Sequence, residues 1–83
     1  MGVKIYTRAG CGYCARAMKL LLKKGISFEE IDVKSDAARA RLAKRTGSTT
    51  VPQIFIGRKH VGGCDDLHAL DKSGELDRLL GRA

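Results

Sequence analysis

The fold is decided by residues 3–25, VKIYTRAGCGYCARAMKLLLKKG, where a β-prone stretch leads through two cysteines into a strong helix former. Residues 2–7 alternate in polarity and predict a first strand. The spacing of the apolar side chains predicts a helix over residues 13–24, with Cys14, Ala17, Met18, Leu21 and Leu22 on its inner face. Gly25 is expected to end this helix in the left-handed cap position.

Cys11 and Cys14 lie three positions apart, where the strand gives way to the helix. Unpaired N–H groups and the positive end of the helix dipole meet there, and both favour the thiolate of Cys11 over the thiol. The thiolate is the reactive form of cysteine. Cys14 lies one turn further on the same face, so it can attack a disulfide formed at Cys11. This geometry is typical of a redox dithiol.

The cysteine count and the absence of long apolar runs indicate the compartment. Three cysteines are an odd number and too few for a secreted disulfide framework. In a reducing compartment, Cys-x-x-Cys beside a βαβ pattern predicts redox chemistry. No apolar run approaches the roughly 20 residues of a membrane span, and no signal-peptide core precedes the first strand. We therefore expect a cytoplasmic protein made of one domain, residues 1–83.

The net charge of +7 raises the question of nucleic-acid binding. The basic residues are spread over two helices, however, and none of the known nucleic-acid motifs is present. Solvated helix faces that also attract anions explain the charge better than a nucleic-acid interface. The residues in question are Arg16, Lys19, Lys23 and Lys24 on the first helix, and Arg39, Arg41, Lys44 and Arg45 on the second.

The rest of the chain is expected to form a second strand, a helix, a hairpin of two strands, a further helix and a last short helix. Residues 26–33 predict a strand, and residues 36–46 predict a helix capped by Ser35 or Asp36. A third strand over 53–56 follows Pro52, and a turn returns the chain through 60–61. Helices are expected over 64–70 and 75–80. The order βαβαββα plus a short C-terminal helix predicts an α/β fold with a mixed four-stranded sheet and helices on both faces.

Three stretches of the chain resemble the signature of the glutaredoxins, and of their small bacterial dithiol class in particular. They are Cys11-Gly12-Tyr13-Cys14, Thr50-Val51-Pro52, and Gly62-Gly63-Cys64-Asp65-Asp66-Leu67. The resemblance covers essentially the whole chain and implies a thioredoxin fold with glutathione-dependent thiol–disulfide exchange. The commoner dithiol motif of the family has Pro where this chain has Gly12, and this difference is expected to alter the redox poise.

The resemblance also implies a glutathione site. Backbone N–H groups at the start of the helix at 64, with the Asp65 side chain, would take the carboxylate and ammonium at one end of the tripeptide. Two arginines are candidates for the carboxylate at the other end. The Val51 backbone would pair with the central cysteine, and Pro52 is cis in the family. The expected glutathione residues are Arg8, Tyr13, Arg39, Thr50, Val51, Pro52, Gly63, Cys64 and Asp65.

In the implied mechanism, Cys11 is the nucleophile and Cys14 the resolving thiol, and both are assigned as catalytic. The expected partners are glutathione, as reductant, and glutathionylated or disulfide-containing proteins, with no nucleic acid and no membrane. Cys64 is expected to be a small buried residue without a redox role. The alternative is a semi-exposed thiol near Cys11 that is glutathionylated or pairs between chains. His60 and His68 show no visible partner and are given no role. Tyr6 and Phe28 are expected to pack within strands.

Parts of the sequence are also compatible with three other functions. With Gly12, the dithiol motif also resembles that of family members that hold a glutathione-ligated [2Fe–2S] cluster between two subunits. In such a dimer of this chain, Cys11 of each subunit and two glutathiones would supply the four sulfur ligands. A dimer that acts as an iron–sulfur carrier or sensor is therefore the alternative function. Without that cluster a monomer without metal is expected. A zinc site built from Cys11, Cys14, His60 and Cys64 is disfavoured, because structural zinc sites usually use two close ligand pairs. A reductase fed by a flavoprotein would leave Arg8, Arg39 and Asp65 without a task.

Overall fold

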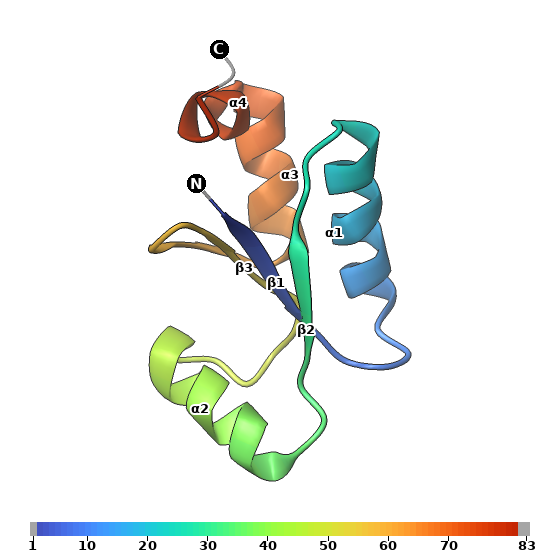
Figure 1. The fold of residues 1–83 in the computed structure, drawn as a ribbon, viewed down its shortest axis with the longest axis vertical. Helices are drawn as coiled ribbons and strands as arrows, with labels where there is room; N and C mark the ends of the chain where they lie inside the picture. Colours follow the sequence, from blue (N-terminus) through green and yellow to red (C-terminus); the bar gives the residue numbers. More distant parts are fainter. Residues whose placement is uncertain (1, 82–83) are drawn as a thin grey trace.

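The computed structural model describes residues 2–81, which alternate between short strands and helices (Figure 1). Their order matches the predicted one. The elements are β1 (Val3–Thr7), α1 (Gly12–Lys23), β2 (Glu29–Asp32), α2 (Asp36–Thr46), β3 (Gln53–Ile56), β4 (Lys59–Gly62), α3 (Cys64–Ser73) and α4 (Glu75–Leu79).

The four strands form one mixed sheet in the order β2-β1-β3-β4. β1 and β2 are parallel, as the βαβ connection through α1 requires, and Ile5 is opposite Glu30. β3 is antiparallel to both β1 and β4, with Ile5 opposite Ile54. The predicted hairpin is therefore confirmed. The pairing of β3 with β4 shifts register between Ile54 and Phe55, so Phe55 is opposite His60 and Ile54 is opposite Gly62.

The two faces of the sheet are covered by different helices. On one face, alternate side chains of β1 and β3 pack against side chains of α1, α3 and α4. The buried cluster that they form includes Val3, Ile5, Ala17, Leu21, Ile54, Ile56, Leu67 and Leu76. On the other face Tyr6 meets the ring of Phe55 edge-on, and Arg45 of α2 lies over Phe55. Figure 1 shows α2 separated from the pair α1 and α3. Helices on both faces were predicted and are present.

The end of α1 explains why the next strand is shorter than expected. Gly25 has a φ of +71°, and its N–H donates to the carbonyl of Leu22 while the N–H of Ile26 donates to Leu21. This pair of bonds is the Schellman motif, which ends a helix and buries the residue that follows, here Ile26. Because the motif occupies the Ile26 amide, sheet pairing begins only at Glu29.

Two predictions about α1 are wrong. Leu22 is 68% exposed, because it lies one position beyond Leu21 and is rotated off the buried face. Lys24 does not lie on a solvated face. Its ammonium donates to the carboxylates of Asp71 and Asp77, so it links the end of α1 to α3 and α4.

Ser35 caps α2 as predicted, since its hydroxyl accepts the N–H of Ala38. Within residues 2–81, no helix combines the length and the apolar character needed to cross a bilayer.

Candidate active site

Cys11 is the N-cap residue of α1, as the sequence predicted. Its sulfur accepts a hydrogen bond from the N–H of Cys14, with an N···S distance of 3.1 Å. The same sulfur lies 3.8 Å from the carbonyl oxygen of Val51, to which its thiol donates. The side chain is neither fully buried nor fully exposed. An N–H donor and the positive end of a helix dipole therefore both stabilise a negative sulfur at a position that solutes can reach.

Cys14 and Cys64 differ from Cys11 in being buried, with exposed fractions of 2% and 6%. Burial, followed by the hydrogen bond with Cys11, raises the pKa of the Cys14 thiol to about 12. Burial also raises the pKa of Cys64, and the nearby charge of Asp65 adds to this effect. All three cysteines are free thiols. The chain thus places one accessible sulfur next to a second sulfur that stays protonated.

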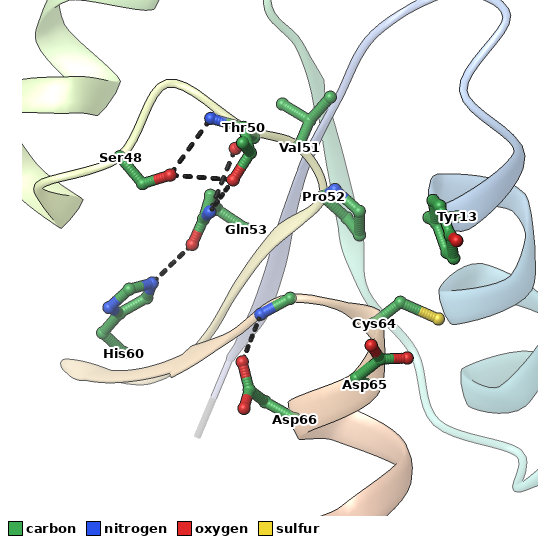
Figure 2. Close-up of a pocket in the computed structure, with 11 residues that line it drawn as sticks. Tyr13, Ser48, Thr50, Val51, Pro52, Gln53, His60, Cys64, Asp65 and Asp66 are labelled. Carbon is green, nitrogen blue, oxygen red and sulfur yellow. Dashed lines mark hydrogen bonds between the residues drawn. The ribbon is translucent and has the colours of Figure 1, made fainter.

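One part of the site is a groove of about 410 Å³ between Tyr13, the loop before β3 and the start of α3 (Figure 2). We call it the Asp65 groove. Seven of the nine predicted glutathione residues line it, and among them Tyr13 is 58% exposed. The whole lining consists of Tyr13, Ser48, Thr50, Val51, Pro52, Gln53, His60, Gly63, Cys64, Asp65 and Asp66.

A second hollow of about 430 Å³, the Cys11 groove, adjoins the first because Tyr13, Thr50 and Val51 line both. It also contains Arg8, the predicted carboxylate partner, and the N–H of Cys11 donates back to the carbonyl of Arg8. The two grooves share these three lining residues, and we call them together the trough. Arg8 and Cys11 line one groove, and the start of α3 lines the other.

The amino terminus of α3 presents backbone N–H groups to the Asp65 groove. Gly63 is its N-cap, and its N–H donates to the carboxylate of Asp66 at 3.0 Å. The N–H groups of Cys64 and Asp65, in the first turn, have no acceptor within the helix. Gly62 makes this cap possible. Its φ is +117°, and a Cβ atom there would lie 2.3 Å from the Asp66 carboxylate oxygen.

The loop before β3 carries the cis Val51–Pro52 bond that the family resemblance implied. The carbonyl oxygen of Pro52 lies 3.5 Å from the position that a Cβ atom on Gly63 would take, so this loop and the start of α3 approach closely. Thr50 and Val51 lie between that contact and Cys11, in the walls of both grooves. The three signature stretches therefore meet at one place.

The structure adds four lining residues that sequence reasoning missed: Ser48, Gln53, His60 and Asp66. The statement that the histidines lack partners is wrong. His60 bonds to Gln53 at 2.6 Å, and Nδ1 of His68 lies 2.8 Å from the carbonyl of Cys64. A signal was present in the sequence, because Gln53 is a polar residue at the start of the otherwise apolar strand Ile54–Ile56.

Arg39 is the one predicted glutathione residue that lines neither groove. It lies on α2 and its guanidinium pairs with Asp36, one turn earlier. The ion pair follows from the i, i+3 spacing on a helix, which brings opposite charges together. Arg39 as a carboxylate partner stays a prediction, whereas Arg8 lies beside Cys11 in the trough.

The described residues, 2–81, contain no group of three or more His, Cys, Asp or Glu side chains placed to hold a metal ion. Cys11 fits the ligand that a bridging [2Fe–2S] cluster needs from each chain, because its sulfur is accessible and already accepts an N–H. Cys14 and Cys64 do not fit, since both are buried and cannot reach a cluster shared with a second chain. The other sulfur ligands would all have to come from outside the chain.

Comparison with known proteins identifies the family. The family model described as Glutaredoxin matches residues 3–61. The chain belongs to the glutaredoxin family. A glutaredoxin of Pseudomonas aeruginosa is 61% identical over 80 residues, covering 94% of each chain, and glutaredoxin 3 of Escherichia coli K12 is 57% identical over 79 residues, covering 94% of this chain and 95% of its own.

Solved glutaredoxin structures share the same fold. The solution structure of a glutaredoxin from Brucella melitensis superposes with a TM-score of 0.88 at 55% identity, over 99% of this chain and 90% of that one. A buckwheat glutaredoxin solved as its glutathione complex gives a TM-score of 0.89 at 37% identity, over 95% and 76%. The thioredoxin fold is thereby confirmed. As a glutaredoxin, the protein is a thiol–disulfide oxidoreductase.

Proposed function

We propose that this glutaredoxin uses glutathione to reduce glutathionylated proteins and protein disulfides, with Cys11 as nucleophile and Cys14 as resolving thiol. The observation that carries the proposal is the trough itself. An accessible sulfur at the N-cap of α1 lines one groove together with Arg8, and the amino terminus of α3 lines the other. A tripeptide with a carboxylate at each end matches this distribution of charge.

Each part of glutathione has a partner of suitable chemistry in the trough. The γ-glutamyl carboxylate suits the free N–H groups of Cys64 and Asp65, and its ammonium suits the Asp65 carboxylate. The glycine carboxylate suits the Arg8 guanidinium. The central cysteine of glutathione then lies near both Val51 and Cys11. The carbonyl oxygen of Val51 and the Sγ atom of Cys11 are 3.8 Å apart. The relative solved with glutathione supports this choice of ligand.

With a glutathionylated protein, the Cys11 thiolate attacks the glutathione sulfur of the mixed disulfide. The S–S bond breaks, the protein leaves as a thiolate that takes a proton from water, and Cys11 becomes glutathionylated. A second glutathione thiolate attacks the sulfur that came from the first. Oxidised glutathione leaves, and the Cys11 thiolate is restored. In sum, one glutathione from solution combines with the glutathionyl group of the substrate to give oxidised glutathione, and the protein thiol is released in reduced form.

With a protein disulfide, Cys11 first forms a mixed disulfide with the substrate. The Cys14 thiol then loses its proton and attacks the Cys11 sulfur, which releases the reduced substrate and leaves a Cys11–Cys14 disulfide. Two glutathiones reduce this disulfide in turn and leave as oxidised glutathione, which supplies the two electrons that the substrate received. Repulsion from a charged Cys11 is one cause of the raised pKa of Cys14. That repulsion ends when Cys11 enters a disulfide, so Cys14 ionises more readily at the step that needs it.

Cysteine substitutions test this assignment in a coupled assay with glutathione, glutathione reductase and NADPH. We expect Cys11→Ser to abolish turnover of a small glutathione mixed disulfide and Cys14→Ser to retain it. Cys14→Ser is also the control for a general effect of losing a cysteine, because it removes a thiol next to Cys11 and keeps the nucleophile. Activity that persists in Cys11→Ser would show that another group is the nucleophile.

A further inference from the structure

A chain of hydrogen bonds runs from the β3–β4 hairpin to the loop that carries Val51 (Figure 2). His60 Nε2 lies 2.6 Å from Gln53 Oε1. Gln53 Nε2 donates to the carbonyl oxygen of Thr50 at 3.0 Å and to its hydroxyl at 3.3 Å. The Ser48 hydroxyl lies 2.8 Å from the Thr50 hydroxyl and accepts the Thr50 N–H at 3.1 Å. Neither Gln53 nor His60 belongs to the three signature stretches.

The direction of these bonds is fixed by chemistry. A backbone carbonyl can only accept, so the part of Gln53 that faces Thr50 O has to be the amide NH₂. The amide oxygen then faces His60, and His60 Nε2 has to carry the proton that it donates. The imidazole is held in place for this bond by stacking on Phe55, with ring centroids 4.9 Å apart.

Gln53 is 5% exposed, so its amide has little access to water. Among the described side chains, every buried nitrogen and oxygen atom has a hydrogen-bond partner, and Gln53 obtains its partners from Thr50 and His60 alone. Turning the Thr50 carbonyl away would leave the Gln53 NH₂ without its main acceptor in a nearly dry site. The Thr50 carbonyl is therefore held toward Gln53.

Planarity of the peptide bond carries this constraint to the trough. The Thr50 carbonyl and the Val51 N–H belong to one trans peptide, in which the C=O and N–H point in opposite directions. When Gln53 holds the carbonyl toward the hairpin, the Val51 N–H points away from the hairpin. Within residues 2–81 no acceptor is found for that N–H, and Val51 lines both grooves.

We propose that Gln53 and His60 are positioning residues that lock the Thr50–Val51 peptide plane, so that the Val51 N–H is presented to the backbone of glutathione. The inference rests on the proposed function and names a specificity device within that site. Gln53 contacts the loop and His60 contacts only Gln53 among these groups, so neither touches the reacting sulfurs. Their loss should weaken recognition of the glutathionyl group and leave the exchange step itself nearly unchanged.

The test compares four variants in the coupled assay and in glutathione titrations followed by the Val51 amide resonance. Gln53→Leu removes both bonds with little change of volume. His60→Phe removes the donor and keeps a ring against Phe55, whereas His60→Gln restores a donor. Lys59→Gln, at the exposed neighbouring position of β4, is the matched control. We expect Gln53→Leu and His60→Phe to raise KM for the glutathione mixed disulfide roughly 3- to 10-fold, as for one lost hydrogen bond, with kcat within about 2-fold.

Gln53→Glu adds a readout that a merely structural role would not move. At neutral pH a carboxylate would oppose the Thr50 carbonyl, whereas a protonated carboxyl group can donate to it. The ratio of the glutathione Kd of this variant to that of the wild type should therefore fall as pH is lowered. Using the ratio cancels any pH dependence of binding that both proteins share.

The outcomes separate this inference from the proposed function. If wild-type protein neither binds glutathione nor turns over the mixed disulfide, the proposed function fails, and the inference fails with it. If wild-type protein does both, but His60→Phe keeps the wild-type KM and Gln53→Glu gives a pH-independent ratio, the inference alone is overturned. His60 is exposed, so His60→Phe remains informative even if Gln53→Leu does not fold. Recovery of KM in His60→Gln is the result expected of a hydrogen-bond donor.

Discussion

Replacing Gly62 with alanine should lower the free energy of unfolding by about 2–4 kcal/mol, from two separate causes. At a φ of +117° an alanine is strained, which costs about 1–3 kcal/mol. Its Cβ would also lie 2.3 Å from the Asp66 carboxylate oxygen, so Asp66 would have to move and release the Gly63 N–H. Loss of an N-terminal cap typically costs about 1 kcal/mol.

Urea denaturation of four proteins separates the two causes. Asp66→Ala removes the cap alone and should cost about 1 kcal/mol. In the Asp66→Ala background, Gly62→Ala meets no carboxylate, so the double variant should lose about 1 kcal/mol less than the sum of the single losses. Gly47→Ala is the matched control, because Gly47 also has a positive φ, +75°, but nothing lies within 4 Å of its would-be Cβ.

Additive losses in this cycle would refute the reasoning, since they would mean that Gly62 and Asp66 do not share a contact. A loss for Gly62→Ala no larger than that for Gly47→Ala would refute it equally. In thermal unfolding, the Gly62→Ala loss corresponds to a decrease in Tm of at least about 8 °C for a chain of this size.

Three further results are expected from the buried residues. Iodoacetamide at pH 8 should label Cys11 in the native protein and leave Cys14 and Cys64 unmodified until urea is added, as mass spectrometry can show; equal labelling would contradict their burial. Because folding raises the pKa of Cys14 from 9.0 to about 12, the stability that it contributes is fully present below pH 9 and is lost as pH rises toward 12; chemical denaturation should show this decline, and Cys14→Ser should reduce it. Leu76→Ala, at a fully buried position, should cost about 2–5 kcal/mol in the same measurement, and a loss under 1 kcal/mol would contradict its place in the core.

Most of the fold could be predicted from local signals. The alternation of β1, the amphipathic α1 and the return to a second strand leave only a parallel βαβ unit, and the hairpin after Pro52 follows from turn chemistry. Boundaries were less predictable where tertiary bonds decide them. Ile26 alternates like a strand residue, yet its N–H belongs to the cap of α1. Lys24 has the sequence context of a surface cation, yet it forms ion pairs with Asp71 and Asp77, which lie 47 and 53 residues later.

The parts of the candidate site that belong to a sequence motif could be predicted, whereas the parts that depend on strand register could not. The dithiol, the loop at 50–52 and the start of α3 could be placed together from the family resemblance. The bond between Gln53 and His60 depends on how β3 pairs with β4, including a register shift at Ile54 and Phe55 that no local pattern announces. Arg39 is the opposite case. Its spacing along the chain suggested a carboxylate partner for glutathione, whereas in the structure its guanidinium pairs with Asp36 on the same helix.

The trough has walls from three distant parts of the chain, around residues 11, 51 and 64. No single segment of the sequence can assemble it, so a half-folded chain would present the thiol of Cys11 without these walls. During synthesis, the walls can be completed only after the residues that begin α3 have left the ribosome.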